Sequence, residues 1–254
     1  MSIGPMLRDW RTRRHLSQMD LALEAGVSTR HLSFVETGRS RPSEDMLMHL
    51  AEQLQVPLRE RNRLLLAAGY APRYEERGLD EPEMRPIADA VALVLKGHEP
   101  FPALAVDHGW ALVAANDAAA LLMAGLPDDL LAPPLNVLRA SLHPDGLAPR
   151  IRNLAEWRDH LLERLRRQIA LTGDPALQTL FDELAGYPVA DPGPELGARN
   201  DVVVPLRLDT DAGELTFFST VTTFGTPVDI TVEELSIESF FPADARTAAA
   251  LRAR

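Results

Sequence analysis

The chain has 254 residues, long enough for two domains, and carries a formal net charge of −11. It contains no cysteine, which excludes disulfides and thiolate metal sites. No apolar run approaches the roughly 20 residues of a membrane helix, and no charged-then-apolar signal segment opens the sequence, so we expect a cytoplasmic protein.

Charge is divided unevenly along the chain. Residues 1–72 hold ten Arg against eight Asp or Glu, a net charge of +2, which leaves −13 for residues 73–254. Basic groups gathered in one region allow an acidic protein to bind DNA. The distribution places any DNA contact in residues 1–72 and argues against a second nucleic-acid domain.

A helix is predicted from Pro5 to His15, followed by two short helices between residues 16 and 38. Ser17 can cap the first of the two, with Asp20 as its capping-box partner. Gly26 supplies the turn because a residue without Cβ adopts positive φ cheaply. This is the pattern of a helix-turn-helix, whose second helix lies in a DNA major groove.

The second helix of this pair has two distinct faces. Ser28 can cap it, and Leu32 and Val35 point inward. An outward stripe at helical spacing consists of Arg30, Ser33, Phe34 and Thr37. Contact with a thymine methyl in the major groove would explain why the aromatic Phe34 is exposed. Arg30 would then bind the O6 and N7 atoms of a guanine beside it. The alternative is that Phe34 packs against a neighbouring domain and Arg30 is only solvated.

Two more helices follow. Ser43 can cap the fourth, whose apolar positions are Leu47, Leu50, Ala51 and Leu54, and Pro57 opens a fifth that ends near Gly69. Five short helices in about 70 residues resemble the Xre family of lambda-repressor-like DNA-binding domains. The residues that carry the resemblance are Arg11, Ser17, Gln18, Leu21, Ala22, Gly26, Val27, Leu32, Val35, Glu36, Gly38 and Pro42.

The resemblance implies a DNA-contacting surface. Gln18 is expected to touch the DNA backbone or a base edge, and Arg39 and Arg41 to meet phosphates. The residues expected to face bases are Thr29, Arg30, Ser33 and Phe34, flanked by Ser28 and Thr37. Phe34 replaces the polar residue of many relatives, which leaves the recognised base step open. Arg11 and Glu36 look like the family's internal ion pair, a structural role.

The sequence predicts a DNA-binding domain over residues 1–72, a linker over 73–86 and a second domain over 87–254. Residues 70–86 are rich in proline and charge and poor in aliphatic side chains, which suits a linker. A helix is then predicted over 87–96, with apolar residues at Ile87, Val91, Leu93, Val94 and Leu95.

The second domain mixes strands and helices. A hairpin is predicted over 101–107 and 110–115 with a turn at His108-Gly109, and Asn116 can cap the helix after it. Helices are expected over 135–142 and 151–171. A second hairpin is expected over 201–208 and 214–224, turning at 209–213, and one or two strands over 228–242. This is the order of a PAS-like sensor, an α+β fold with one antiparallel sheet and helices on one face.

The whole chain resembles the MmyB-like transcription regulators, which join an Xre helix-turn-helix to a PAS-like ligand-binding domain. The second-domain residues that carry this are Phe101-Pro102-Ala103-Leu104, Asp107, Trp110, Ala115-Asn116, Leu142-His143-Pro144, Asn153-Leu154-Ala155-Glu156-Trp157, Phe224-Gly225-Thr226-Pro227 and Phe241-Pro242-Ala243-Asp244. The resemblance implies an apolar or fatty-acid-like effector.

A pocket is expected between the sheet and its helices, because small-molecule sites are mostly apolar with a few polar groups. Candidate lining residues are the aromatic Trp110, Trp157, Phe217 and Phe240, with Asn116, His143 or Arg150 for a polar head group. The alternative is that the aromatics are core and His143 caps a turn. Arg164, Arg166 and Arg167 suit either a carboxylate or a solvated helix face.

Motifs of catalysis and metal binding do not appear in the sequence. The seven histidines show no HxxxH spacing, and there is no GxSxG, P-loop or GxGxxG. We therefore expect a transcription regulator with no enzymatic activity and no cofactor, which binds a double-stranded DNA operator as a homodimer and senses a small lipophilic effector. The alternative is that the second domain is a protein-interaction and dimerisation module; a closed interior with an exposed apolar patch would favour it.

Overall fold

The computed structural model describes residues 2–188, 203–211 and 213–253. The chain forms two compact units. The first comprises Met1–Arg77, Ala170–Gly173 and Thr226–Glu233, and the second comprises Gly78–Ile169, Asp174–Gly225 and Glu234–Arg254.

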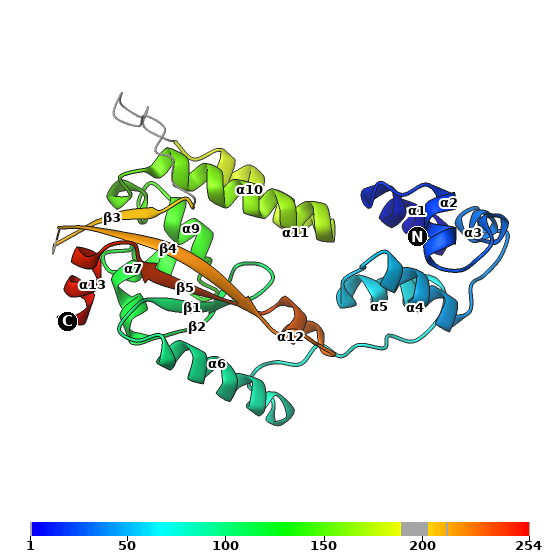
Figure 1. The fold of residues 1–254 in the computed structure, drawn as a ribbon, viewed down its shortest axis with the longest axis horizontal. Coiled ribbons are helices and arrows are strands. Elements are labelled where there is room, and N and C mark those ends of the chain that lie inside the picture. Colours follow the sequence, from blue (N-terminus) through cyan, green and yellow to red (C-terminus); the bar gives the residue numbers. More distant parts are fainter. Residues whose placement is uncertain (1, 189–202, 212, 254) are drawn as a thin grey trace. The chain divides into compact units, whose positions relative to one another are not determined.

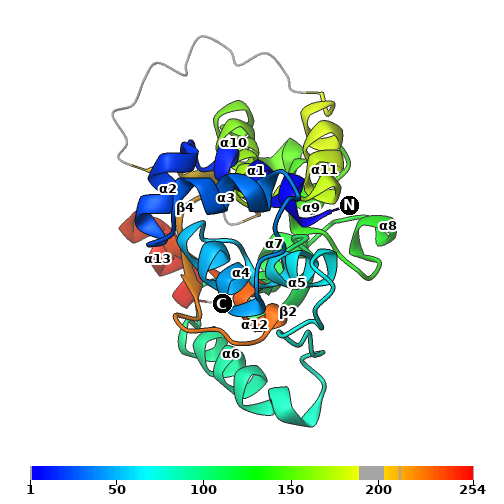
Figure 2. The same ribbon diagram turned by 90° about the vertical axis from the view of Figure 1, so that its right-hand side faces the viewer.

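The N-terminal part of the first unit is helical (Figures 1 and 2). Its helices are α1 (Ile3–Arg13), α2 (Gln18–Glu24), α3 (Thr29–Glu36), α4 (Glu44–Gln53) and α5 (Leu58–Ala67). The first helix begins at Ile3 and not at Pro5, because Pro5 is accommodated in the first turn, where its missing N–H has no helical partner. All five helices predicted from the sequence are therefore present.

The helix ends follow the capping chemistry in the sequence. Ser17 Oγ accepts a hydrogen bond from the backbone N of Asp20 at 3.1 Å, and Asp20 Oδ2 accepts one from the backbone N of Ser17 at 2.8 Å. Gly26 has φ +62°, the left-handed conformation expected at the turn. Fully buried leucines and valine unite the helices into one core: Leu7, Leu21, Leu32, Val35, Leu47 and Leu54.

The second unit is an α+β fold. Its strands are β1 (Ala103–Val106), β2 (Leu112–Ala115), β3 (Leu206–Thr210), β4 (Gly213–Thr223) and β5 (Ser236–Pro242). Its helices are α6 (Arg85–Gly97), α7 (Ala120–Met123), α8 (Asp128–Leu131), α9 (Val137–Leu142), α10 (Leu154–Thr172), α11 (Pro175–Ala185) and α13 (Ala245–Arg252), with short 3₁₀ turns η1 (Pro82–Met84), η2 (Asp117–Ala119) and η3 (Ala148–Arg150). The last turn of α10 falls in the first unit, as does most of α12 (Ile230–Glu234).

The five strands form one antiparallel sheet in the order β2-β1-β5-β4-β3. In β5 the register pairs Glu238 with Leu104 of β1 and with Val221 of β4. Strand β4 is longer than β3: within the described chain, residues 213–217 pair with β3, whereas 218–223 pair with β5 alone.

Helices cover both faces of the sheet, which corrects the expectation of one covered face (Figure 1). Leu104 and Val106 of β1 belong to the large core with α9, α10 and α11. Ala103 and Ala105 alternate with them and pack against Val91 and Leu95 of α6. All four residues of β1 are therefore buried.

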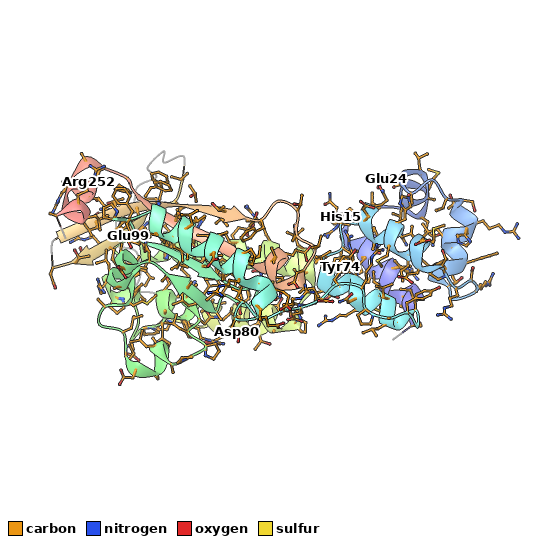
Figure 3. All side chains as sticks on the ribbon, turned by 90° about the horizontal axis from the view of Figure 1, so that it is seen from below. His15, Glu24, Tyr74, Asp80, Glu99 and Arg252 are labelled. Atoms are coloured by element: carbon orange, nitrogen blue, oxygen red, sulfur yellow. The ribbon has the colours of Figure 1, made fainter. Side chains whose placement is uncertain are left out.

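Helix α6 begins inside the predicted linker, at Arg85. Of the five apolar residues of the predicted helix, Leu93 and Val94 are 74% and 40% exposed. After the helix, Glu99 (labelled in Figure 3) accepts a hydrogen bond from the backbone N of Asp117 at 2.8 Å. Of these five apolar residues, only Val91 and Leu95 are buried.

Three other predictions of secondary structure need correction. Residues 230–234, expected as strand, form α12, and β5 begins only at Ser236. The second hairpin does not turn at 209, because Asp209 and Thr210 extend β3 and β4 begins at Gly213. Residues 201–202 of the predicted strand lie outside the described residues. Helix α11 was not predicted; Asp174 caps it and Pro175 opens it.

Candidate DNA-binding surface and ligand cavity

The outer face of α3 carries the stripe expected to read DNA. Arg30 and Thr37 are exposed, and Ser33 and Phe34 are half-buried. The Phe34 ring lies between two guanidinium groups, 5.3 Å from Arg30 and 5.8 Å from Arg39. Phe34 is thus less exposed than the sequence predicted, because cation–π contacts hold both arginines against its ring.

Two hydroxyl groups at the ends of α3 already make hydrogen bonds to the helix backbone. Ser28 Oγ accepts from the backbone N of His31 at 3.1 Å, and Thr37 Oγ1 donates to the carbonyl oxygen of Ser33 at 2.7 Å. Thr29 is exposed at the first turn of α3. Arg30 and Phe34 therefore offer the largest side chains on this face.

Glu36, at the end of α3, is the centre of a buried polar cluster. Arg11 donates from Nε to Glu36 Oε1 at 2.6 Å and from Nη2 to Oε2 at 2.9 Å. Gln18 donates from Nε2 to Glu36 Oε2 at 2.8 Å, and Arg11 Nη1 donates to the carbonyl oxygen of Leu16. The ion pair implied by the resemblance is present, and the amide of Gln18, expected at DNA, is oriented by Glu36.

These hydrogen bonds determine the charge state of Glu36. Burial acts to raise the pKa of Glu36, but hydrogen bonds from Arg11 and Gln18 and the positive charges of Arg11 and Arg8 outweigh it. The pKa of Glu36 therefore lies below its ordinary value, and the carboxylate is ionised at neutral pH. This cluster ties α1 and α2 to the end of α3.

The loop after α3 presents Arg39 and Arg41 differently. Arg39 is exposed beside Phe34, as described above. Arg41 lies 4.8 Å over the Tyr70 ring and donates to the carbonyl oxygen of Gly69 at 3.3 Å. Arg41 is therefore engaged by Tyr70 and Gly69, whereas Arg39 lies beside Phe34 on the outer face of α3.

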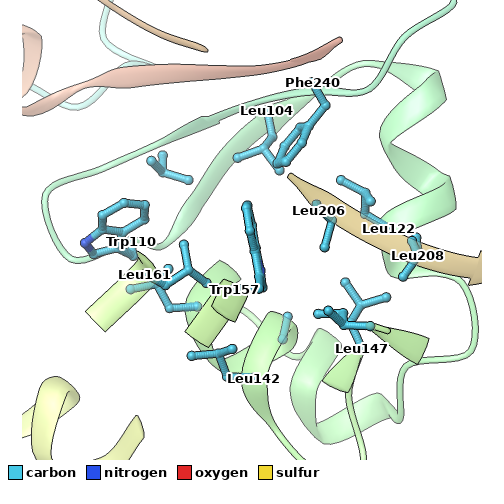
Figure 4. Close-up of a cluster of buried hydrophobic side chains, with 14 of the residues drawn as sticks. Leu104, Trp110, Leu122, Leu142, Leu147, Trp157, Leu161, Leu206, Leu208 and Phe240 are labelled. Carbon is cyan, nitrogen blue, oxygen red and sulfur yellow. The ribbon is translucent and has the colours of Figure 1, made fainter. Parts of the chain in front are cut away.

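A cavity of about 60 Å³ lies within the core of the second unit. It is lined almost entirely by apolar side chains: Leu104, Leu122, Met123, Leu126, Leu135, Val137, Leu138, Ala140, Leu147, Trp157, Leu161, Leu206 and Phe240, with Ser141 and Glu238 as the polar members. Figure 4 shows Trp157 between Leu104 and Phe240 on one side and Leu142 and Leu147 on the other. A volume of this size accepts a few water-sized groups.

Two of the seven predicted ligand residues, Trp157 and Phe240, line this cavity. Phe217 is fully buried in the surrounding core, and Trp110 is buried with its Nε1 donating to Gln168 Oε1 at 2.7 Å. These two aromatics lie in the core around the cavity and are not among its lining residues.

The three predicted polar ligand residues are also elsewhere. Asn116 Oδ1 accepts from the backbone N of Ala103 and Ala119, and its Nδ2 donates to the carbonyls of Leu95 and Phe101, which uses the whole amide. His143 Nδ1 accepts from the backbone N of Asp145 at 3.1 Å. Arg150 donates to the carbonyls of Ala124 and Asp209 beside an open surface depression.

The sequence reasoning missed Glu238 and Ser141. Ser141 Oγ accepts from Trp157 Nε1 at 3.0 Å, and Glu238 accepts from Arg164 Nη1 at 2.7 Å. One sequence signal points to Glu238: alternation along β5 places it on the same face of the sheet as the predicted core residue Phe240.

His160 of α10 is half-buried. Burial, and then the positive charge of Arg164, lower the pKa of His160, which favours the neutral imidazole.

Two of the three arginines of α10 that the sequence offered for a carboxylate are on its solvated side. Arg166 and Arg167 are exposed and both pair with Glu163.

A separate cluster joins α9 to α11, where Arg139 donates twice to Glu183, at 2.8 and 2.7 Å. Tyr187 donates to Glu183 Oε1 at 2.6 Å, and burial together with this hydrogen bond raises the pKa of Tyr187 to about 12.

The described residues contain no group of three or more His, Cys, Asp or Glu side chains placed to hold a metal ion. None of the helices in that part of the chain is long and apolar enough to cross a membrane.

Comparison with known proteins gives matches in both parts of the chain. Residues 87–253 match the MmyB-like transcription regulator ligand binding domain, and residues 7–61 match a helix-turn-helix family. HTH-type transcriptional regulators from two strains of Mycobacterium tuberculosis are each 43% identical over 53 residues. That match covers 21% of this chain and 38% of each relative. The chain belongs to the MmyB-like transcription regulators, DNA-binding proteins that join a helix-turn-helix to a ligand-binding domain.

Proposed function

We propose that the chain binds a double-stranded operator as a homodimer, with the outer face of α3 in the major groove. The observation that supports this is the Arg30–Phe34–Arg39 cluster on that face, where an aromatic ring suited to a thymine methyl is flanked by two cations. In a two-fold dimer, the two reading helices engage half-sites about 34 Å apart or a multiple of that distance. Because the operator is in the bacterial cytoplasm, the chain acts there.

Substitutions on the face and its edge test this docking. In a gel-shift titration, Arg30→Ala should cost about 1–3 kcal/mol and relax base preference. Arg39→Ala should weaken binding to all sequences similarly and reduce the salt slope by about one. Arg63→Ala, an exposed arginine of α5, is the matched control and should leave affinity unchanged. Full operator affinity in both variants on the α3 face would contradict the docking.

We further propose that the cavity around Trp157 binds a small lipophilic metabolite with a tail like that of a fatty acid. The support is an almost wholly apolar lining in a domain of ligand-binding type. Ligand sites usually measure about 300–1,000 Å³, so lining side chains must move to admit a ligand. Met123 is the most adaptable of them, because it is unbranched and has three rotatable side-chain bonds.

Native mass spectrometry of co-purifying molecules, followed by thermal melting, tests the effector. A ligand that binds only the folded state stabilises it by about 2.7 kcal/mol at a hundredfold excess over its Kd. An effector must also change operator affinity, because coupling between two sites is reciprocal. No melting shift across a panel of apolar metabolites would contradict the effector.

A second candidate is a dimerisation module without an effector. It is favoured by the small free volume of the cavity and by an open groove between α6 and β2, in which Val113 is 39% exposed. Val113→Glu in the full chain tests it by sedimentation velocity. Loss of the dimer in that variant, together with no ligand-induced melting shift in the original protein, would select this candidate over the sensor.

A further inference from the structure

The inward face of β5 places a carboxylate in an otherwise apolar wall. Glu238 lines the cavity and is only 6% exposed. Its neighbour Ile237 packs on the opposite face of the sheet with α6, whereas Phe240, two residues on, lines the same cavity. A buried charge is expensive unless it has a partner, so the position requires an explanation.

Arg164 provides a partner for one of the two carboxylate oxygens. Its Nη1 donates to Glu238 Oε1 at 2.7 Å, and its guanidinium carbon lies 4.9 Å over the Trp110 ring. Among the described residues, Glu238 Oε2 accepts no hydrogen bond from a protein donor. A carboxylate can accept about four hydrogen bonds, so Glu238 retains acceptor capacity.

The rest of the lining offers no positive charge. Ser141 is the other polar lining residue, and its oxygen already accepts from Trp157 Nε1. A ligand carboxylate in this cavity would therefore face the negative charge of Glu238, and like charges placed together are strongly unfavourable. A hydroxyl or a protonated amine would instead donate a hydrogen bond to Glu238.

We propose that this cavity selects a lipophilic ligand whose polar end donates a hydrogen bond to Glu238, and that it discriminates against a carboxylate on the same tail. This inference depends on the ligand cavity proposed above and specifies its head group. Glu238 is then the residue that determines specificity, and Arg164 is a positioning residue that holds Glu238 in the wall.

Three probes with one tail test the proposal on the full chain: 1-hexanol, hexylamine and hexanoate at pH 7, titrated by calorimetry. Hexanol, hexylamine or both should bind at least about tenfold more tightly than hexanoate, because leaving a buried charged group opposed or unpaired costs more than 1.4 kcal/mol. Hexanoate binding equally well or better would overturn the inference and leave the ligand cavity standing. If none of the three binds, the cavity itself is refuted as a ligand site.

The variant Glu238→Gln tests the role of the residue. It removes the negative charge and leaves Arg164 without its carboxylate, so hexanoate should gain affinity and the tenfold preference should disappear. Glu163→Gln, on the solvated side of α10, is the matched control and should keep the preference. An unchanged preference in Glu238→Gln would overturn the assignment. Circular dichroism checks the fold of each variant, and if Glu238→Gln does not fold, the comparison of probes on the original chain decides.

Discussion

Replacement of Arg11 and Glu36 tests how the helix-turn-helix is held together. The two side chains are 11% and 1% exposed and share two hydrogen bonds of 2.6 and 2.9 Å. We consider Arg11→Met, Glu36→Met and the double variant. Each single change leaves the other member's charge buried, whereas the double change replaces both charges by flexible apolar side chains of similar length.

The magnitude follows from this burial. Removal of one partner of a buried pair costs about 3–5 kcal/mol, whereas replacement of both by apolar groups is often close to neutral. Glu36→Met also removes the acceptor of Gln18, so its cost should lie at the upper end of that range. The double variant should be less destabilised than the sum of the single variants by about 1–3 kcal/mol.

Hydrogen exchange of α1 and α3 amides in the full chain measures the opening free energy locally. Asp9→Ala is the control, because it removes the surface ion pair of Arg13, in which Asp9 is 59% exposed, and should cost no more than about 0.5 kcal/mol. The reasoning is refuted if the effects of the single variants add within about 0.5 kcal/mol.

The pH dependence gives a second check of the same pair. The pKa of Glu36 is lower in the folded chain than in the unfolded chain. The contribution of the pair is therefore complete above the unfolded pKa of about 4.3 and is lost as the pH falls through the folded-state pKa. Glu36→Met should remove this part of the acid sensitivity.

The remaining predictions concern single side chains, measured by denaturation or titration. Gly26→Ala should lower the free energy of unfolding by about 1–2 kcal/mol through backbone strain at φ +62° alone, because no atom lies within 4 Å of the added Cβ. An unchanged free energy of unfolding would show that the turn relaxes. Asn116→Ala should cost about 1–3 kcal/mol, because it removes a side-chain hydrogen bond from each of four backbone groups, and a neutral result would contradict a structural role. Tyr187 should ionise near pH 12 by absorbance at 295 nm, so its stabilisation is present below about pH 10 and is lost as the pH rises through 12. Tyr187→Phe should abolish that late transition.

Much of the helix-turn-helix could be predicted because its signals are local. Ser17 and Asp20 are three residues apart, and Gly26 needs no distant partner to adopt positive φ. The outward position of Arg30 and Thr37 on α3 followed from helical spacing alone. What spacing could not show was the position of Arg39, which folds back from the following loop onto Phe34 and covers part of its ring.

The cavity was harder to predict because its walls come from distant segments. Glu238 and Arg164 are 74 residues apart in sequence, so the pair appears only when α10 lies against β5. Asn116 looked like a polar ligand group, but the backbone around it uses every hydrogen bond that its amide can make. Residues 230–234 contain β-branched side chains that favour strand, yet they form α12, where Ile230 and Val232 are buried. Burial in the tertiary structure overrides such a local preference.

The unequal lengths of β3 and β4 have a consequence for association between molecules. Beyond residue 217, β4 is bonded to β5 on one side, and within the described chain no strand covers its other side. Four consecutive β-branched residues, Thr220, Val221, Thr222 and Thr223, are exposed there, with no proline or charge among them. Such an edge is a template for pairing with a foreign strand. At high concentration or on heating, residues 220–223 are therefore where β-rich aggregates of the folded protein should nucleate.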